Sequence, residues 1–205
     1  MRLLPSGSTA LLVELDGLDE VLALYAALDE DRPAGVADIV PAGRTVLVVI
    51  DPAATDLATV ERAVRSARPR YDRETTGDLV EIPVHYDGED LADVGALLDC
   101  DPAEVVRRHT TEEWTVAFCG FAPGFGYLTG SRYHWDIPRR PSPRTSVPAG
   151  AVALAGEFSG IYPRASPGGW QLIGHTKVAV FDLDRDPPAL LLPGTRVRFV
   201  EVGAR

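Results

Sequence analysis

The sequence of 205 residues contains no asparagine, one glutamine (Gln171) and one lysine (Lys177). Its two cysteines, Cys100 and Cys119, lie in unlike contexts and form neither a disulfide framework nor a metal-binding pattern. No apolar run approaches the roughly 18 residues that a membrane span requires. The first residues also lack the apolar core and cleavage site of a signal peptide. We therefore expect a cytoplasmic protein with two reduced thiols, no metal site and no membrane contact.

Basic residues are outnumbered: 20 Lys and Arg stand against 30 Asp and Glu, which gives a formal net charge of −10. Nucleic-acid binding depends on clustered cations, so this balance argues against a nucleic-acid partner. The segment after Trp114 is nevertheless net basic, with arginines at positions 139, 140, 144, 164, 196 and 198. A small anionic ligand could bind there, although each arginine taken alone is better explained as a solvated surface residue.

The first half of the chain combines strand and helix patterns. Aliphatic and β-branched runs alternate with apolar residues at helical spacing, at residues 10–15, 18–28, 45–51 and 57–67. A polar stretch, ARPRYDRETTGD, then separates these elements from a further strand at 78–86. The sequence therefore predicts a small α/β domain over residues 1–78 and a boundary before residue 79.

The second half predicts a helical pair followed by many short strands. The pair is expected near 90–110, and its second helix has a capping-box start, with Asp101 as N-cap, Pro102 next and Glu104 at the third helical position. After it, strand patterns separated by Pro- and Gly-rich turns occur at 114–121, 151–156, 170–174, 177–183 and 196–202. This is typical of an antiparallel barrel or sandwich over residues 79–205, so the fold class is α+β.

Four segments of the second half combine glycine, proline and polar side chains, at 118–130, 138–150, 156–170 and 171–176. Glycine allows a loop to take unusual backbone conformations, and proline restricts the residues beside it, so loops that contain both suit a preorganised binding surface. A small barrel, however, also needs glycine at its corners. The candidate substrate- or nucleotide-binding residues are Gly124, Phe125, Gly126, Tyr127, Arg164, Gly168, Gly169, Trp170 and Thr176. The glycines of 124–130 could hold a phosphate through backbone N–H groups, with Arg144 pairing to it in bidentate fashion.

Three further side chains join Arg144 as candidate catalytic residues. Gln171 offers both a donor and an acceptor, which suits an amide or lactam edge. His109 ends a capped helix, where it is either an imidazolium favoured by the helix dipole or a proton shuttle or anion ligand. His175 follows a glycine at a strand end, where it faces either a pocket or solvent.

Several motifs resemble those of one known family. FCGFAPGFGYL, SPRTSVPAG, GIYP and SPGGWQLIGHT are similar, in order and spacing, to the family that includes the B-type subunit of prokaryotic 5-oxoprolinase, subunit 1 of allophanate hydrolase and the kinase inhibitor KipI. DIVPAGRTVLVVIDP and IPVHYDGEDL extend the resemblance over essentially the whole chain. It implies a small α/β domain followed by a cyclophilin-like β-barrel. Gly126 departs from it where proline is usual. His175 departs from it where arginine is frequent, so anion binding at that position is either lost or pH-dependent.

The resemblance also implies an activity. It points to a subunit, inactive alone, of an ATP-dependent 5-oxoprolinase that opens the small lactam 5-oxo-L-proline to L-glutamate, with ATP as its Mg complex. The implied partners are a homologous C-type subunit, of the allophanate hydrolase subunit 2 type, and a LamB/YcsF-type subunit. Two alternatives stay open: a KipI-like inhibitor of a sensor histidine kinase, and a carboxyltransferase or allophanate hydrolase-type subunit in urea catabolism.

Overall fold

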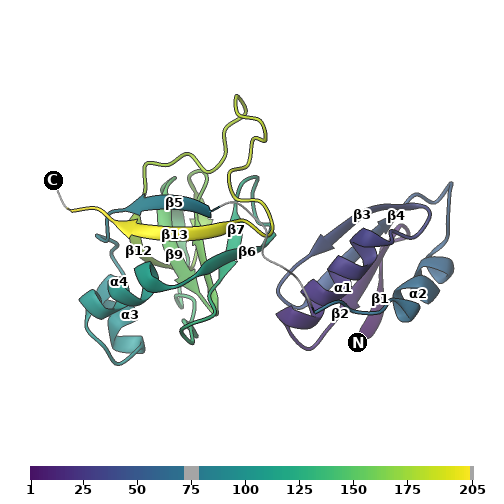
Figure 1. The fold of residues 1–205 in the computed structure, drawn as a ribbon, viewed down its shortest axis with the longest axis horizontal. Helices are drawn as coiled ribbons and strands as arrows, with labels where there is room; N and C mark the ends of the chain where they lie inside the picture. Colours follow the sequence, from purple (N-terminus) through teal and green to yellow (C-terminus); the bar gives the residue numbers. More distant parts are fainter. Residues whose placement is uncertain (72–78, 204–205) are drawn as a thin grey trace. The chain divides into compact units, whose positions relative to one another are not determined.

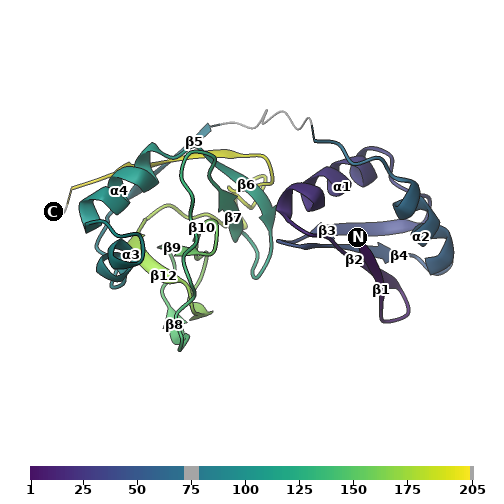
Figure 2. The same cartoon turned by 90° about the horizontal axis from the view of Figure 1, so that it is seen from below.

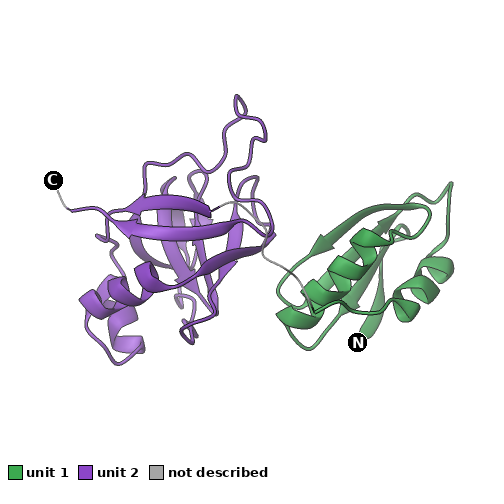
Figure 3. Cartoon of the chain, viewed as in Figure 1, with its two compact units in different colours: residues 1–74 green, residues 75–205 purple. Residues whose placement is uncertain are grey.

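The chain forms two compact units, residues 1–74 and 75–205 (Figure 3). The computed structural model describes residues 1–71 and 79–203. Each unit has a hydrophobic core of its own. The predicted boundary before residue 79 borders a stretch that lies outside the described residues.

Unit 1 is a four-stranded antiparallel sheet with two helices on one face (Figure 1). In chain order its elements are β1 (Arg2–Ser6), β2 (Ala10–Glu14), α1 (Leu18–Glu30), β3 (Val36–Pro41), β4 (Thr45–Ile50) and α2 (Leu57–Ser66). The strand order is β1-β2-β4-β3. Alternate strand residues such as Val13, Val46 and Val48 are fully buried in one core with Leu24 and Val60 of the helices, as the period of two predicts.

Strand β1 is not among the predicted strands of unit 1. It has only two aliphatic residues and contains Pro5, which cannot donate to a ladder. The structure places it at the edge of the sheet, where it pairs with β2. Proline is tolerated in strands at such edges, so a short edge strand leaves little signal in the sequence.

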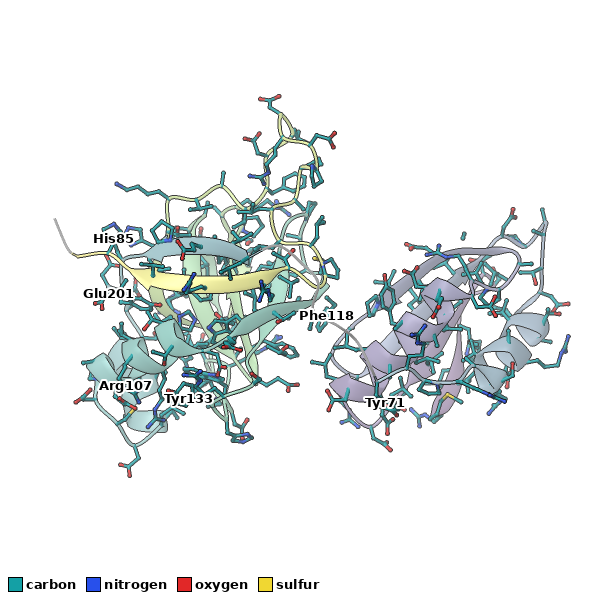
Figure 4. The ribbon with its side chains drawn as sticks, viewed as in Figure 1. Tyr71, His85, Arg107, Phe118, Tyr133 and Glu201 are labelled. Atoms are coloured by element: carbon teal, nitrogen blue, oxygen red, sulfur yellow. The ribbon has the colours of Figure 1, made fainter. Side chains whose placement is uncertain are left out.

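Seven strands in the described part of unit 2 form one sheet that almost closes into a barrel. They are β5 (Leu79–Val84), β6 (Trp114–Cys119), β7 (Gly126–Thr129), β9 (Ala151–Ala155), β10 (Phe158–Ile161), β12 (Gln171–His175) and β13 (Arg196–Glu201). Their order is β12-β9-β10-β7-β6-β13-β5. Beyond β5, the backbones of His85 and His175 exchange hydrogen bonds of 2.9 and 2.8 Å, which joins β5 to β12 (Figure 4 labels His85). The predicted α+β class with a barrel is therefore confirmed, although β5 and β13 pair in parallel.

Two helices, α3 (Leu91–Leu97) and α4 (Pro102–Thr111), lie side by side against this barrel (Figures 1 and 2). The Asp101 carboxylate accepts the N–H of Glu104 at 2.7 Å, as the capping pattern predicts. The Glu104 carboxylate does not accept the backbone N–H of Asp101, as a full capping box would require. It pairs with Arg107 and Arg108 instead. The helices described in the chain run from 7 to 13 residues, and none has the length and apolarity that crossing a bilayer demands.

The Gly- and Pro-rich segments contain more strand than the sequence predicts. Strands β7 and β10 of the barrel lie in them, and so do β8 (Arg144–Val147) and β11 (Ser166–Gly168), which form a separate two-stranded sheet. Each of these four strands has only three or four residues. Their shortness, and the glycine or proline in β7, β10 and β11, hide the alternation that longer strands show.

The strand predicted at 177–183 is wrong. Only an isolated bridge between Phe181 and Ala189 occurs there. The Val178 N–H is bonded to the Thr176 hydroxyl at 3.2 Å, and the Ala179 carbonyl accepts from the Arg185 guanidinium at 2.9 Å. Side chains rather than a neighbouring strand therefore satisfy part of this backbone.

Candidate functional site

A buried carboxylate, Asp90, organises the region where the Gly- and Pro-rich segments meet; it is 1% exposed. Its Oδ2 accepts the backbone N–H of Leu172 at 2.7 Å. Its Oδ1 accepts from Arg140 Nη1 and, at 2.8 Å, from Arg144 Nη2. Burial alone would raise the pKa of this carboxyl, but the hydrogen bonds from Arg144 and Leu172 and the two arginine charges hold the pKa below its usual value. Asp90 is therefore an anion at neutral pH.

A glycine brings Asp90 against strand β12. The Gly88 N–H donates to the Ile173 carbonyl at 3.2 Å, and the Asp90 N–H donates to the Leu172 carbonyl at 3.0 Å. A Cβ at position 88 would lie 2.3 Å from the Leu172 carbonyl oxygen. Only glycine allows this approach without a backbone shift, so residues 88–90 run tightly along β12.

Arg140 and Arg144 bring two guanidinium groups to this place. The Arg140 backbone N–H donates to the Gly169 carbonyl at 2.8 Å, which fastens the 138–144 segment near the start of β12. Arg144 also contacts Glu89 at 3.1 Å, but the Glu89 side chain is 78% exposed, so solvent weakens that pair. Two guanidinium groups thus share one buried carboxylate. Arg140 Nε and Arg144 Nη1 are themselves buried and find no hydrogen-bond partner among the described residues.

Gln171 supplies a complementary group. Its side chain is buried (7% exposed for the residue), and Nε2 donates to the Pro138 carbonyl at 3.1 Å. Its Oε1 is buried with no donor within reach in the described part of the chain. An unpaired buried polar atom is costly, so such atoms mark places where a ligand can complete the bonding. The arrangement suits a ligand with an anionic oxygen group and an N–H donor.

An aromatic cluster adjoins these polar groups. The Phe125 ring is buried, and its centroid lies 5.1 Å from Tyr127 and 5.3 Å from both Tyr162 and Trp170 in edge-on contacts. Burial raises the pKa of Tyr162, and a backbone hydrogen bond from Trp170 lowers it in part. These rings form a rigid apolar wall that also holds Trp170, the residue before Gln171.

Gly168 connects the aromatic wall to the arginines. It is paired with Arg144 in the two-stranded sheet of β8 and β11. A Cβ at Gly168 would lie 2.3 Å from the Tyr162 hydroxyl oxygen, whereas one at Gly169 would meet Pro143 no closer than 3.6 Å. Close packing therefore requires glycine at 168 but not at 169. The structure brings together seven sequence-predicted residues: Arg144, Gln171, Phe125, Tyr127, Gly168, Gly169 and Trp170.

The other two predicted glycines pack against the chain itself. Gly124 has a φ of +81°, and a Cβ there would lie 2.5 Å from the Phe181 Cβ. A Cβ at Gly126 would lie 3.2 Å from the Leu191 Cβ. Both glycines are buried. This packing argues against the phosphate cradle expected at 124–130.

His109 lies inside the barrel core rather than at a free helix end. Its Nε2 is 2.9 Å from the Ser159 hydroxyl, and its Nδ1 is 2.7 Å from the Tyr86 hydroxyl. The centroid of the Phe199 ring lies 4.3 Å from the centroid of the His109 ring. Burial lowers the pKa of His109 to about 3, so the ring is neutral and the alternative of a capping imidazolium is wrong. It shares no hydrogen-bond partner with Arg144 or Gln171 among the residues that the structure describes.

Three remaining candidates also have their own surroundings. His175 stacks on His85 with ring centroids 5.0 Å apart, and its Nδ1 lies 2.8 Å from Asp87 Oδ1. Thr176 is buried and uses its hydroxyl on a neighbouring backbone N–H. Arg164 is exposed. None of these side chains is hydrogen-bonded to Arg140, Arg144 or Gln171 in the part of the chain that the structure describes.

Two residues of the cluster, Asp90 and Arg140, are not among the predicted site residues. Asp90 occurs in the acidic run EDLADV, which looks like a solvated helix start, and its backbone partner is 82 positions away. Its only signal is its place in DGEDL, two residues after the glycine that approaches β12. Arg140 resembles any other arginine of PRRPSPR until Asp90 is placed beside it.

Comparison with known sequences gives one consistent result. A family model described as carboxyltransferase domain, subdomain C and D, matches residues 1–191. The B-type subunit of 5-oxoprolinase from Escherichia coli O157:H7 is 42% identical over 174 residues, which cover 83% of this chain and 79% of that protein. The B-type subunit of 5-oxoprolinase from Bacillus subtilis (strain 168) is 37% identical over 94% of this chain and 85% of that protein.

Solved structures share the fold. The crystal structure of TTHA0988 superposes with a TM-score of 0.76 at 37% identity, over 96% of this chain. This chain spans only 40% of that longer protein. The urea carboxylase of Kluyveromyces lactis superposes with a TM-score of 0.76 over 99% of this chain and 23% of its own, but at 18% identity that likeness concerns the fold alone.

Proposed function

The chain belongs to the carboxyltransferase-domain family that includes the B-type subunits of 5-oxoprolinase, and from this membership we propose that it is the corresponding subunit of an ATP-dependent 5-oxoprolinase. The complex would convert 5-oxo-L-proline, ATP and water to L-glutamate, ADP and phosphate. Its companions would be a homologous C-type subunit and a LamB/YcsF-type subunit. A cytoplasmic location belongs to the same proposal, because ATP is a cytoplasmic substrate.

The observation that carries the proposal is the partly buried cluster of Arg140, Arg144 and Gln171. In it, two arginine donors and the Gln171 acceptor are buried atoms without a hydrogen-bond partner among the described residues. The lactam 5-oxo-L-proline carries a carboxylate, a ring N–H and a ring carbonyl. In this proposal the two arginines bind the carboxylate, because guanidinium groups suit planar anionic oxygens. Gln171 Oε1 accepts the ring N–H. Asp90 is a positioning residue that fixes both arginines through one oxygen.

The donor and acceptor atoms proposed to bind the lactam are closed to solvent, so substrate entry needs a small movement. Arg140 Nε, Arg144 Nη1 and Gln171 Oε1 are all buried. The 138–144 segment is exposed over most of its length and is fastened to β12 by the Arg140 and Gln171 bonds described above. We assign this segment the movement that admits the lactam.

Ring opening breaks the amide C–N bond of the lactam. ATP would supply the driving force by phosphorylating the amide oxygen, which makes the carbonyl carbon a better electrophile for water. The ring nitrogen then leaves as the amine, and phosphate is released. The residues of this chain would hold the lactam by its carboxylate and N–H, and would exclude bulk water from the ring through the wall formed by Phe125 and Trp170. The 124–130 loop does not fit a triphosphate, since Phe181 and Leu191 occupy the space beside its glycines. The nucleotide contacts are therefore proposed to come from the partner subunits.

Reconstitution tests this function. The protein is mixed with its C-type and LamB/YcsF-type partners, and ADP and glutamate are measured with and without 5-oxo-L-proline. Glutamate formation that needs all three proteins and is stoichiometric with ADP supports the proposal. Associated, folded partners that show no lactam-stimulated ATP hydrolysis would contradict it. Carboxyl transfer to urea, dependent on a biotinylated partner, would then be the next activity to measure, and inhibition of a sensor histidine kinase the one after that.

A further inference from the structure

A strained turn lies at the end of β6, in the motif GFAPGFG. Phe121 has a φ of +64°, in the left-handed region that glycine favours. The Ala122 N–H donates to the Gly120 carbonyl at 2.7 Å, which closes a three-residue turn around Phe121. A turn of this kind with positive φ at its centre is rare, and a bulky aromatic residue in that conformation is an outlier.

The surrounding chain holds this turn in place. The Gly120 N–H donates to the Phe125 carbonyl at 3.2 Å, and the Phe125 N–H donates to the Ala122 carbonyl at 3.0 Å. Gly124 fits closely against Phe181. Strained residues persist only where neighbouring contacts determine their conformation, and they concentrate at functional sites.

The strain keeps an apolar ring in solvent. Phe121 is 59% exposed, and among the described residues no other phenylalanine and no tryptophan is exposed. Its ring touches the aromatic wall only edge-on, with centroids 5.3 Å from Phe125 and 6.0 Å from Tyr162. Residues 121–123 therefore form an apolar knuckle whose leading side chain is fixed before any partner arrives.

We propose that this knuckle is an anchor for the companion C-type subunit, with Phe121 inserting into an apolar pocket of that protein; the inference rests on the proposed role of the chain in a 5-oxoprolinase complex. Aromatic side chains dominate the binding energy of interfaces, and a ring that is already ordered loses little entropy on binding. The ring has no polar atom with which to take part in chemistry. The module also occurs within a longer chain in the 37% identical structure, where it spans 40% of the protein, so additional polypeptide accompanies it there.

Replacing Phe121 by glycine separates anchoring from folding. Glycine adopts a φ of +64° without strain, so Phe121→Gly should fold with an unchanged or higher midpoint of thermal unfolding. Its dissociation constant for the purified C-type partner, measured by calorimetry, should rise by about 30-fold or more. Phe121→Asn, which also tolerates this conformation, should show the same loss.

Asp99→Gly is the matched control. Asp99 is exposed and has a φ of +51°, and it is the other non-glycine residue with positive φ in the described chain. Its replacement should relieve strain in the same way and leave the dissociation constant unchanged.

The outcomes distinguish the anchor from the function on which it rests. If the unaltered protein does not bind the C-type partner, the assignment to a 5-oxoprolinase complex fails and the anchor fails with it. If the unaltered protein binds and Phe121→Gly binds equally well, the anchor alone is overturned. It is also overturned if Phe121→Gly unfolds at a lower temperature while Asp99→Gly does not, or if only the KM for 5-oxo-L-proline rises, since the ring would then serve the fold or the ligand.

Discussion

The carboxylate of Asp90 accepts the backbone N–H of Leu172 at 2.7 Å, a bond between residues 82 positions apart. One oxygen of Asp90 thus fixes β12, and the other fixes Arg140 and Arg144. Gln171, the residue before Leu172, donates its Nε2 to the Pro138 carbonyl, which ties its amide to the segment that carries both arginines. A single buried anion therefore determines the geometry of the candidate site, and several expected outcomes depend on it.

Asp90 should matter far more than its neighbour Glu89, although both contact Arg144. Asp90→Asn removes the buried anion and leaves two guanidinium groups without it, which should lower the free energy of unfolding by roughly 3–5 kcal/mol. Glu89→Gln alters an exposed pair and should cost less than about 1 kcal/mol. Urea unfolding at pH 7 measures both. Equal effects of the two substitutions would contradict the buried-anion account.

His109 gives a pH dependence with a definite sign. Its pKa falls to about 3 in the folded protein, against about 6.5 in an unfolded chain. Below pH 6.5 the unfolded chain binds a proton that the folded protein refuses, so stability is lost as the pH falls towards 3. The loss should reach about 1.4 kcal/mol at pH 5.5 relative to pH 7.5.

Two histidine variants isolate this effect. His109→Gln should lack that part of the pH dependence, whereas the same change at the exposed His134 should keep it. Urea midpoints at pH 7.5 and 5.5 provide the comparison. A His109→Gln variant that loses as much stability between these pH values as the unaltered protein would show that His109 is not held neutral.

Glu112 is a second buried carboxylate, with a structural role. Its two oxygens accept hydrogen bonds from the backbone N–H groups of Ser131, Arg132 and Tyr133 and from Trp135 Nε1. Burial would raise the pKa of Glu112, but these donors hold it below its usual value. Glu112→Gln places an amide against N–H donors and should cost about 3 kcal/mol.

The adjacent Glu113 is the control for Glu112. Its side chain is 82% exposed and lies 4.0 Å from Arg132, so Glu113→Gln should change stability by less than about 0.5 kcal/mol. Thermal unfolding of both variants, followed by calorimetry, distinguishes them. If Glu112→Gln were equally neutral, the 131–135 loop would not depend on that carboxylate.

The two adjacent glycines before Trp170 should respond differently to alanine. A Cβ at Gly168 would collide with the Tyr162 hydroxyl, whereas one at Gly169 has room. Gly168→Ala should therefore lower the free energy of unfolding by about 1–3 kcal/mol, and Gly169→Ala should leave it within about 0.5 kcal/mol. A denaturation series on the two variants is sufficient. The reverse order of effects would mean that the aromatic wall is packed differently.

Local patterns predicted the elements that have strong local causes. Such causes exist for the Asp101 cap, for the helices on either side of it, and for the aliphatic strands β2, β4, β6, β9 and β13. Strands of three or four residues rich in glycine or proline have none, because neighbouring strands rather than their own composition hold them. The same holds for the site: Arg144 and Gln171 lie in conspicuous motifs, but Asp90 becomes a site residue only through a contact distant in sequence.

His109 shows a signal that the sequence did contain. It follows Val105 by four residues, which places the two on one face of α4, and both are buried. The helix dipole favours a charged imidazole at this end, but desolvation inside the core has the larger effect on its pKa. Helical periodicity was the better guide here than position in the helix.

The central claim is that Arg140 and Arg144 bind the carboxylate of a lactam acid. Its most direct measurement compares kcat/KM for 5-oxo-L-proline and for 2-pyrrolidone, which has the same ring without the carboxylate, in the reconstituted complex containing Arg140→Met. The account predicts a loss of about 100-fold for 5-oxo-L-proline, little change for 2-pyrrolidone and an unchanged KM for ATP. An equal loss for both lactams, or a rise in the KM for ATP alone, would contradict it.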